Sequence, residues 1–402
     1  MNEERCVECQ IESLAYGGDG IARMDGCVLF VPETAVGDRV RVRITQRKKR
    51  FARGVVDAIL IPSSDRDTPC CRRAGVRVPG CVYDHLSYAA EVRAKQSQLR
   101  GFFRALPDVD ACLAPFFAAP EFLHYRNKLT VHVAHGKMGY YLEQSHTVLD
   151  VEACPLSCEA INAALRIFRR EHALARYEGA NVVFRATPHN GAIWWSDTGA
   201  QSVGCPDVLL ETSPAGLMRV SPKGFYQVHP AVAQQLVACV AQRFCCSTVS
   251  HDIVDLYCGV GVFGLTCLQR GGRSLVGVEA GFDAVRCARE NAAALGLAAT
   301  FHACALTEDA APGVTLAQLC RVPAETTVIV DPPRSGMART IAFSLAHSGV
   351  ARIFYVSCDP ATLQRDVQIL QAEGHYRVTF IRGFDMFPRT AHFETLVELV
   401  RQ

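Results

Sequence analysis

The chain has 402 residues, of which 49% are hydrophobic and 20% charged, and its net charge at neutral pH is +2. This length and composition predict a soluble globular protein of two or three domains, and the small net charge excludes a global attraction to nucleic acid, so that any such surface must be local. No apolar run is long enough to span a membrane, and the opening "MNEERCVECQ" lacks the apolar stretch of a signal peptide, which predicts a cytoplasmic protein.

Short strands are predicted over residues 10–60, because "AYGGDG", "RMDG" and "TAVGD" supply turn chemistry at regular spacing. This pattern is typical of a small β-barrel, which we expect to occupy residues 1–60. Eight Lys or Arg residues and no acidic residue occur from Arg39 to Arg53. On a barrel of a near-neutral protein, this run favours a phosphate-binding edge over an ordinary solvated loop.

A central α+β domain is predicted for residues 61–215, beginning with the linker "LIPSSDRDTP". A helix is expected from about His85 to Leu106, where large apolar residues recur at helical spacing. Further along, "LTVHVAH" alternates as a strand does, and Gly136 marks a turn.

Nineteen cysteines are spread along the chain, and in a reducing compartment each is expected to fill core, bind metal or act in catalysis. Filling core is the ordinary role of a free cysteine. We expect it for five that lie among alanines, valines and leucines: Cys245, Cys246, Cys267, Cys287 and Cys304.

From about Ser221 onward strands and helices alternate, which predicts a doubly wound α/β domain over residues 216–402. The predicted strands include "HDIVDLY", "RSLVGVEA", "TTVIVDPP" and "ARIFYVSCDP". Ligands of such a sheet bind at the carboxyl ends of its strands, so the residues that follow these strands are the candidates for a site.

The stretch "DLYCGVGVFG" places Gly259, Gly261 and Gly264 at the spacing G-x-G-x-x-G. Alone this motif is a weak signal, because dinucleotide-binding proteins share it. Asp255 precedes the glycines, and Glu279 ends the next predicted strand, where a carboxylate can accept both hydroxyls of a ribose. S-adenosylmethionine has a ribose and a cationic sulfonium but no phosphate, so the acidic lining favours it as the cofactor.

Cys358 is the main candidate for catalysis. It directly follows the predicted strand "FYVS", and Pro360 ends that strand, so the thiol is expected at an exposed carboxyl end. Methylation of a pyrimidine at carbon 5 needs a thiolate that adds to carbon 6, a sulfonium donor, and a base that removes the proton from carbon 5. Cys358 and Glu394 suit the roles of nucleophile and base. The loop "DPPRSG" at Asp331 leaves a nitrogen-methylating enzyme as an alternative, because a similar loop holds the target amine in amino-methyltransferases.

Six signatures give the chain a resemblance to the bacterial RNA uracil-5-methyltransferase family along nearly its whole length: "SPKGFYQVHP", "DLYCGVGVFG", "VGVE", "DPPRSG", "YVSCDPATLQRD" and "DMFPRTAHFE". The resemblance implies a class I S-adenosylmethionine-dependent methyltransferase fold, with Cys358 as the nucleophile and Glu394 as the base. The cofactor-binding positions that it implies are Gln227, Tyr257, Glu279 and Asp331.

The N-terminal barrel resembles a TRAM domain, an RNA-binding module that several rRNA-directed family members have and the tRNA-specific branch typically lacks. RNA is therefore the implied partner, and a uridine of 23S rRNA is the expected target, with no membrane or obligate protein partner indicated. A tRNA-directed enzyme and an RNA-binding or folding factor with decayed catalysis are the alternatives. The target uracil must be unpaired or flipped out, and Phe225 and Phe263 are candidates either for stacking on it or for core packing.

The same resemblance implies a [4Fe-4S] cluster. Cys81, in "PGCVYDHL", and Cys154, in "DVEACPL", match family positions. The family's usual C-x5-C-x2-C spacing is replaced here by the adjacent Cys70 and Cys71, followed by nine residues before Cys81. Four thiolates meet the requirement of such a cluster, and Cys158 could replace one of the adjacent pair.

Three residues near the predicted site depart from the family pattern. Asp359 and His229 stand where Asn is usual, and Val262 replaces a polar residue. A carboxylate beside the Cys358 thiol would raise the thiol pKa and slow its attack, unless that carboxylate is protonated or turned away.

Overall fold

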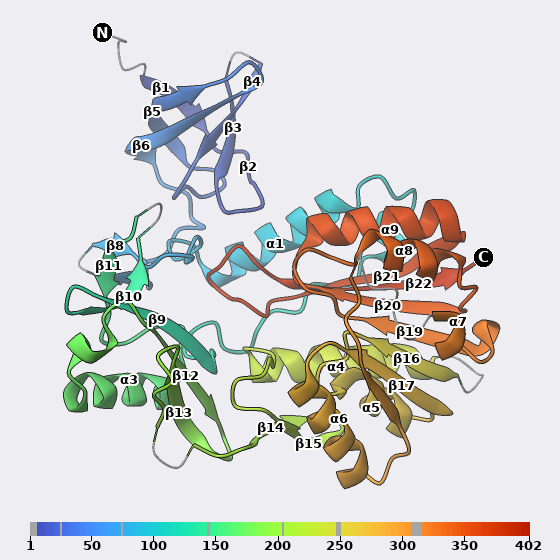
Figure 1. Cartoon of the computed structure of the whole chain (residues 1–402). Helices are drawn as coiled ribbons and strands as arrows, with labels where there is room; N and C mark the ends of the chain where they lie inside the picture. The colour runs from blue at the N-terminus through green and yellow to red at the C-terminus, as the bar shows by residue number, and fades with distance from the viewer. Residues whose placement is uncertain are drawn as a thin grey trace.

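The computed structural model describes residues 6–24, 26–73, 75–142, 145–202, 205–246, 251–307 and 316–402. The chain passes from a small β-barrel through a central α+β region into a large sheet covered by helices (Figure 1). Among the described residues, no helix has the length and apolar character needed to cross a membrane.

The N-terminal strands form the predicted barrel. They are β1 (Cys6–Gln10), β2 (Ser13–Leu14), β3 (Gly20–Met24), β4 (Cys27–Val31), β5 (Arg39–Arg47) and β6 (Phe51–Ile61). Their order is β1-β5-β6-β4-β3-β2, and every pair is antiparallel except β4 with β6. On β5 the valines at 40 and 42 are buried while Arg39 and Arg41 are exposed, so the alternation turns the basic side chains of this strand to solvent.

The central region begins with β7 (Arg72–Arg73), β8 (Val76–Arg77), α1 (Tyr88–Phe102) and α2 (Val109–Cys112). A five-stranded antiparallel sheet of order β11-β10-β9-β12-β13 follows. Its strands are β9 (Lys128–Ala134), β10 (Lys137–Tyr141), β11 (Val148–Asp150), β12 (Asn181–Thr187) and β13 (Gly191–Ser196), accompanied by α3 (Glu159–Glu171) and η1 (Leu174–Tyr177). The hairpin of β14 (Leu209–Ser213) and β15 (Gly216–Val220) leads to the last region.

The C-terminal sheet has seven strands in the order β18-β17-β16-β19-β20-β22-β21. Neighbouring strands from β18 to β20 pair in parallel, whereas β22 pairs antiparallel with both β20 and β21. The elements are α4 (Pro230–Cys245), β16 (Asp252–Leu256), α5 (Val262–Gln269), β17 (Ser274–Glu279), α6 (Phe282–Ala294), β18 (Thr300–Ala303), α7 (Leu316–Leu319), η2 (Pro323–Glu325), β19 (Thr326–Val330), α8 (Arg339–His347), β20 (Arg352–Ser357), α9 (Pro360–Gly374), β21 (Tyr376–Phe384) and β22 (Glu394–Arg401). This is the predicted doubly wound arrangement.

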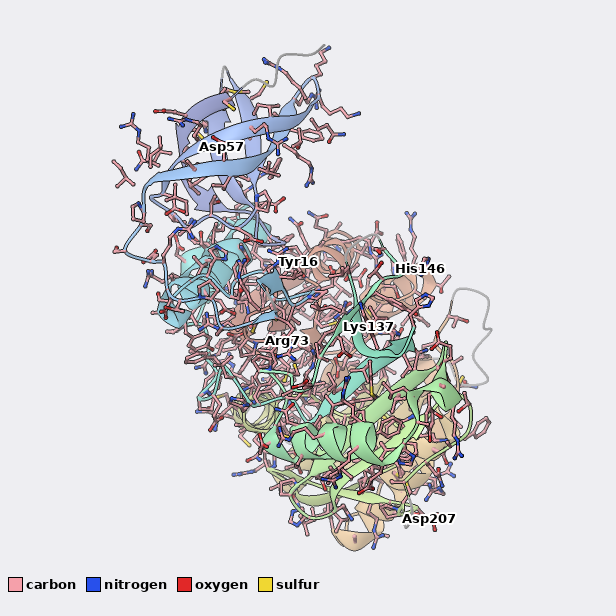
Figure 2. All side chains as sticks on the ribbon, turned by 90° about the vertical axis from the view of Figure 1, so that its left-hand side faces the viewer. Tyr16, Asp57, Arg73, Lys137, His146 and Asp207 are labelled. Atoms are coloured by element: carbon pink, nitrogen blue, oxygen red, sulfur yellow. The ribbon has the colours of Figure 1, made fainter. Side chains whose placement is uncertain are left out.

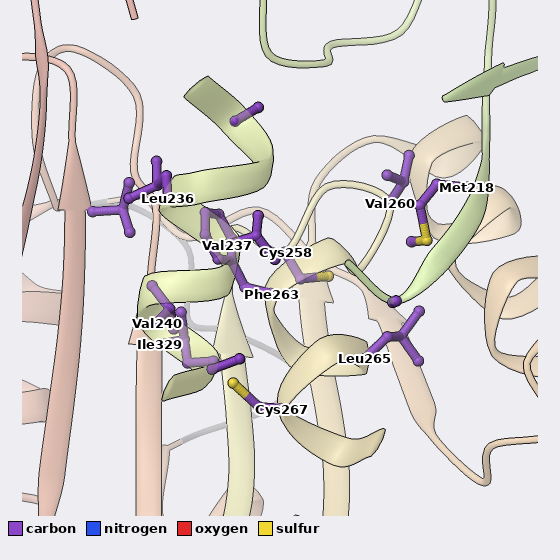
Figure 3. Packing of buried hydrophobic residues seen from close by; sticks show 14 of the residues in the cluster. Met218, Leu236, Val237, Val240, Cys258, Val260, Phe263, Leu265, Cys267 and Ile329 are labelled. Atoms are coloured by element: carbon purple, nitrogen blue, oxygen red, sulfur yellow. The ribbon is translucent and has the colours of Figure 1, made fainter. Parts of the chain in front are cut away.

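Helices cover both faces of the C-terminal sheet, and β16 and β19 are therefore buried along their whole length. On one face, α4 and α5 meet through residues such as Leu236, Val240 and Phe263 (Figure 3). On the other face, α1 joins α8 and α9, and its Leu99 lies in the same apolar cluster as residues of both helices.

The expectation that five cysteines fill core holds for Cys267 and Cys287, which are buried, while Cys304 is half-buried. It is wrong for Cys245 and Cys246, which are exposed. Cys245 is the last residue of α4 and Cys246 its C-cap, so neither lies on the part of the helix that packs on the sheet.

Candidate functional site

Strand register brings most of the predicted site residues to one edge of the C-terminal sheet. Leu256 on β16 pairs with both Val278 on β17 and Val330 on β19, and β19 continues in register with β20. The residues at these strand ends are Tyr257, Glu279, Asp331 and Cys358. Ser357 in turn pairs with Thr395 on β22, so Cys358 comes opposite Glu394. This edge is where a doubly wound sheet binds its ligands.

The glycine turn after β16 is shaped by contacts to two carboxylates. The Gly259 N–H donates to Glu279 Oε2 at 3.1 Å, and the Gly281 N–H donates to Oε1 at 2.8 Å. The Gly264 N–H donates to Asp255 Oδ2 at 2.9 Å, and a Cβ on Gly264 would lie only 2.8 Å from that oxygen. A side chain at this position would therefore break the contact. Tyr257, which opens the turn, has a φ of 60°.

The same edge brings together buried and half-buried carboxyl groups. Burial raises the pKa of Asp255 to about 8, with further upward contributions from Asp331 and Glu279. Burial and the Glu279 carboxylate raise the pKa of Asp331 well above its ordinary value. A bound cation would relieve these repulsions, so the pocket suits a positively charged ligand such as a sulfonium.

The Glu394 carboxyl group lies close enough to the Cys358 thiol to perturb it. Burial first and the Glu394 carboxylate second raise the pKa of Cys358 to about 12, and the Arg334 guanidinium opposes the rise. Burial and Asp331 raise the pKa of Glu394 well above its usual range, again opposed by Arg334. Glu394 Oε2 is buried and has no hydrogen-bond partner among the described residues. These surroundings therefore disfavour the ionised forms of both groups, and added positive charge favours them.

Asp359 is turned to the backbone of α9. Its Oδ1 accepts the N–H groups of Ala361 at 2.9 Å and Thr362 at 3.0 Å, as the N-cap of that helix. The principal causes of the raised Cys358 pKa are burial, Glu394 and Asp331, not this neighbouring residue. The departure at 359 is thus accommodated by helix capping.

The remaining predicted residues lie on the segment before α4. Gln227 is buried, and its carbonyl accepts the Asn127 side-chain amide at 3.1 Å; no hydrogen bond of its side chain to the sheet edge is found in the part of the chain that the structure describes. His229 stacks on Tyr125, which indicates a packing role. Of the two candidate stacking residues, Phe263 is buried in the core and Phe225 is 71% exposed, so only the latter is available to a base.

The cysteines assigned to a cluster by resemblance lie near one another. Cys70 Sγ and Cys71 Sγ are 3.8 Å apart, and the Cys71 thiol also interacts with Cys81 and Cys154. Within the described ranges, however, no group of three or more His, Cys, Asp or Glu side chains is arranged to hold a metal ion. Cys158 lies at the N-cap of α3.

Two residues near the site escaped the sequence reasoning. Arg334, within the quoted "DPPRSG", is exposed and is the cation that acts on both Cys358 and Glu394. Tyr16 comes from the barrel, and its hydroxyl lies 3.3 Å from His392 Nδ1. Burial first, and then Asp359 and Cys358, raise the pKa of this hydroxyl. Figure 2 shows Tyr16 where the barrel meets the rest of the molecule. The motif could have revealed Arg334, whereas no local signal marks Tyr16.

A buried ion-pair network holds the loop that leads into Glu394. The Lys95 ammonium on α1 lies 2.8 Å from Glu91 Oε1 and 2.7 Å from Asp385 Oδ1. The Arg389 backbone N–H donates to Glu91 Oε1 at 2.7 Å. These contacts fix residues 385–389 against α1.

Comparison with known proteins gives matches along the whole chain. A family model described as tRNA (Uracil-5-)-methyltransferase matches residues 217–402, and a TRAM domain model matches residues 4–56. The 23S rRNA (uracil(1939)-C(5))-methyltransferase RlmD of Thiobacillus denitrificans is 30% identical, over 96% of this chain and 98% of its own. An uncharacterized RNA methyltransferase of Thermosynechococcus vestitus is also 30% identical, over 98% of this chain and 97% of its own.

The fold has a counterpart among solved structures. The crystal structure of Pyrococcus abyssi tRNA (uracil-54, C5)-methyltransferase in complex with S-adenosyl-L-homocysteine matches with a TM-score of 0.73 at 23% identity. The match covers 98% of this chain and 100% of that one. It shows that the whole chain, from the barrel to the doubly wound sheet, shares the fold of that protein.

Proposed function

Because this chain belongs to the RNA uracil-5-methyltransferase family, we propose that it methylates carbon 5 of a uridine in 23S rRNA, with S-adenosylmethionine as the methyl donor. The observation that carries the proposal is the pairing of β20 with β22, which sets Cys358 opposite Glu394 beside an acidic pocket. The rRNA target is supported by the full-length similarity to RlmD of Thiobacillus denitrificans, and the TRAM match supports RNA as the partner. The retention of both candidate catalytic residues disfavours a decayed RNA-binding factor.

The chemistry divides between the two residues. The Cys358 thiolate adds to carbon 6 of the uracil, and the electron pair of the 5,6 double bond moves to carbon 5 and the carbonyl oxygen at position 4. S-adenosylmethionine, when bound, supplies the electrophilic methyl group that carbon 5 accepts. Glu394 then takes the proton from carbon 5, and the restored double bond expels the Cys358 thiolate. The acidic pocket of Asp255, Glu279 and Asp331 provides the cofactor site next to these groups.

Charge balance explains how the half-buried Cys358 thiol can become a nucleophile. Burial and nearby carboxylates raise the pKa of Cys358, which disfavours the thiolate in the free protein. Arg334 acts in the opposite direction on both Cys358 and Glu394. A cationic ligand in the acidic pocket adds to the effect of Arg334, so thiolate formation is coupled to cofactor binding.

The proposal is tested with Cys358→Ala and Glu394→Gln variants and tritium-labelled S-adenosylmethionine. We expect Cys358→Ala to abolish methyl transfer to rRNA while cofactor binding stays intact. Glu394→Gln should form the covalent RNA adduct but release it slowly. RNA containing 5-fluorouracil should trap a denaturation-resistant complex with the wild type and not with Cys358→Ala. Persisting tritium transfer by Cys358→Ala would reject the mechanism, and transfer to tRNA alone would reject the rRNA target.

A [4Fe-4S] cluster held by Cys70, Cys71, Cys81 and Cys154 is a second proposal. Its support is the donor set: Cys71 lies within reach of the other three thiols, and Cys71, Cys81 and Cys154 are buried. Cluster iron binds cysteine side chains as deprotonated thiolates, so these four thiols would lose their protons on binding it. Anaerobically purified protein should be brown and contain about four irons per chain. Folded, colourless, iron-free protein would reject the cluster. If Cys70→Ala keeps the wild-type iron content and Cys158→Ala loses iron, then Cys158 is the ligand in place of Cys70.

A further inference from the structure

A cavity of about 340 Å³ lies where the barrel meets residues 77–82. Phe30 and Arg53 of the barrel line it, together with the turn at 17–19, Glu33 and Arg77. The Arg53 guanidinium lies 5.6 Å from the centroid of the Phe30 ring. The wall of the cavity is therefore aromatic and cationic on the same side, as in proteins that stack nucleic acid bases.

The charges in the cavity are balanced. Arg53 Nη1 lies 3.3 Å from Asp19 Oδ2, and Arg77 Nη1 lies 3.8 Å from Glu33 Oε1. A site for phosphate would have excess positive charge, and this cavity has none. It offers carboxylates that accept hydrogen bonds and guanidinium groups that donate them beside a flat aromatic ring, which suits an uncharged planar heterocycle.

The cavity and the candidate catalytic centre share one short segment of backbone. Tyr16 contacts His392, two residues before Glu394, and Gly17 to Asp19 line the cavity. Three residues span at most about 10 Å, so the turn that lines the cavity lies within about 10 Å of Tyr16, which contacts the segment leading into Glu394.

The shared segment is held firmly in place. The Gln98 side-chain amide donates to the Ala15 carbonyl at 2.9 Å, and the Gly18 N–H donates to the same carbonyl at 3.0 Å. A Cβ on Gly18 would lie 2.8 Å from Val82, so the turn packs directly on the central region. A base in the cavity would consequently have a fixed position relative to the segment that leads into Glu394.

We propose that this cavity, the flanking-base pocket, binds an unpaired nucleobase with an exocyclic amino group, from a nucleotide near the target uridine. The inference rests on the proposed function for the identity of the RNA. Phe30 stacks on the base, Asp19 or Glu33 accepts from its amino group, and Arg53 or Arg77 donates to a ring nitrogen or carbonyl. The exposed arginines of β5 do not line the pocket, and we expect them to contact RNA phosphates instead.

The test measures the affinity of the full-length protein for a 23S rRNA fragment by filter binding, which does not depend on methyl transfer. Phe30→Ala should weaken binding about tenfold, within the range that loss of base stacking gives. Phe30→Leu, which keeps an apolar contact to Phe51, should lose nearly as much. Ile61→Ala, at an exposed barrel position, is the matched control and should bind as the wild type does.

Abasic substitutions then identify the bound nucleotide. Each nucleotide flanking the target uridine is replaced in turn by an abasic one. At one of these positions the missing base should weaken binding to the wild type about tenfold and should not further weaken binding to Phe30→Leu. The pocket would be overturned if both Phe30 variants bound RNA with wild-type affinity. It would also be overturned if, at every abasic position, the loss of affinity from Phe30→Leu and the loss from the missing base were independent of each other. Filter binding does not require methyl transfer, so failure of the pocket would leave wild-type turnover intact. Failure of the proposed function would instead abolish turnover in the wild type itself, and the two outcomes are therefore distinguishable.

Discussion

Replacing Lys95 with Met removes the centre of the ion-pair network that holds residues 385–389 against α1. The ammonium lies 2.8 Å from Glu91 and 2.7 Å from Asp385, and all three side chains are fully buried. Met fills a similar volume without the charge, so the variant leaves two buried carboxylates without the cation that they share. Breaking a buried pair in this way costs about 3–5 kcal/mol. We expect the free energy of unfolding to fall by that amount.

Denaturant unfolding followed by circular dichroism measures this loss. Arg100→Met is a matched control on the same helix, because its ion pair with Asp110 joins side chains that are 54% and 71% exposed. Exposed pairs contribute little to stability, so the control should keep the wild-type midpoint. A midpoint for Lys95→Met no lower than that of Arg100→Met would refute the reasoning.

The loss should also depend on pH. Burial already raises the pKa of Glu91, and removal of Lys95 raises it further. A carboxyl group whose pKa is higher in the folded than in the unfolded state stabilises the fold at low pH, and this contribution disappears as the pH rises through the folded value. The stability deficit of Lys95→Met should therefore shrink as the pH falls from 8 to 5. A deficit independent of pH would assign the loss to packing.

Three further predictions concern the site itself. Burial raises the pKa of Asp255 to about 8 and also raises that of Asp331. As the pH rises from 6 to 9 these groups ionise and attract the sulfonium, so the affinity for S-adenosylmethionine should increase relative to that for S-adenosylhomocysteine. Calorimetric titration measures both affinities, and equal pH slopes for the two ligands would contradict the prediction. Arg334→Gln should move the pH profile of covalent adduct formation to higher pH, since the lost guanidinium had lowered the pKa of the thiol, whereas exposed Arg286→Gln should leave the profile in place. Gly264→Ala should abolish cofactor binding measured by the same titration, because its Cβ would lie 2.6 Å from Leu275 and 2.8 Å from Asp255; wild-type affinity would show that the turn can shift.

The sequence alone was sufficient for the architecture of the C-terminal sheet and for the residues at its carboxyl edge. Parallel strands end in recognisable turns, and register then carries Tyr257, Glu279, Asp331 and Cys358 to one edge. The barrel was likewise predictable from its turn spacing, and the TRAM match confirms it. These features depend on short segments whose periodicity and turn chemistry set the local backbone.

Only the tertiary structure decided which distant side chains meet. Tyr16 and His392 are 376 residues apart in the chain, and Lys95 is 290 residues from Asp385. The direction of the Asp359 carboxylate and the exposure of Cys245 also escaped local reasoning, because each depends on where a helix begins or ends against its neighbours. A short pattern encodes the conformation of its own segment, whereas contacts between segments arise from the packing of the whole chain. The meeting of Cys358 with Glu394 and Tyr16 at the candidate site is a contact of the second kind.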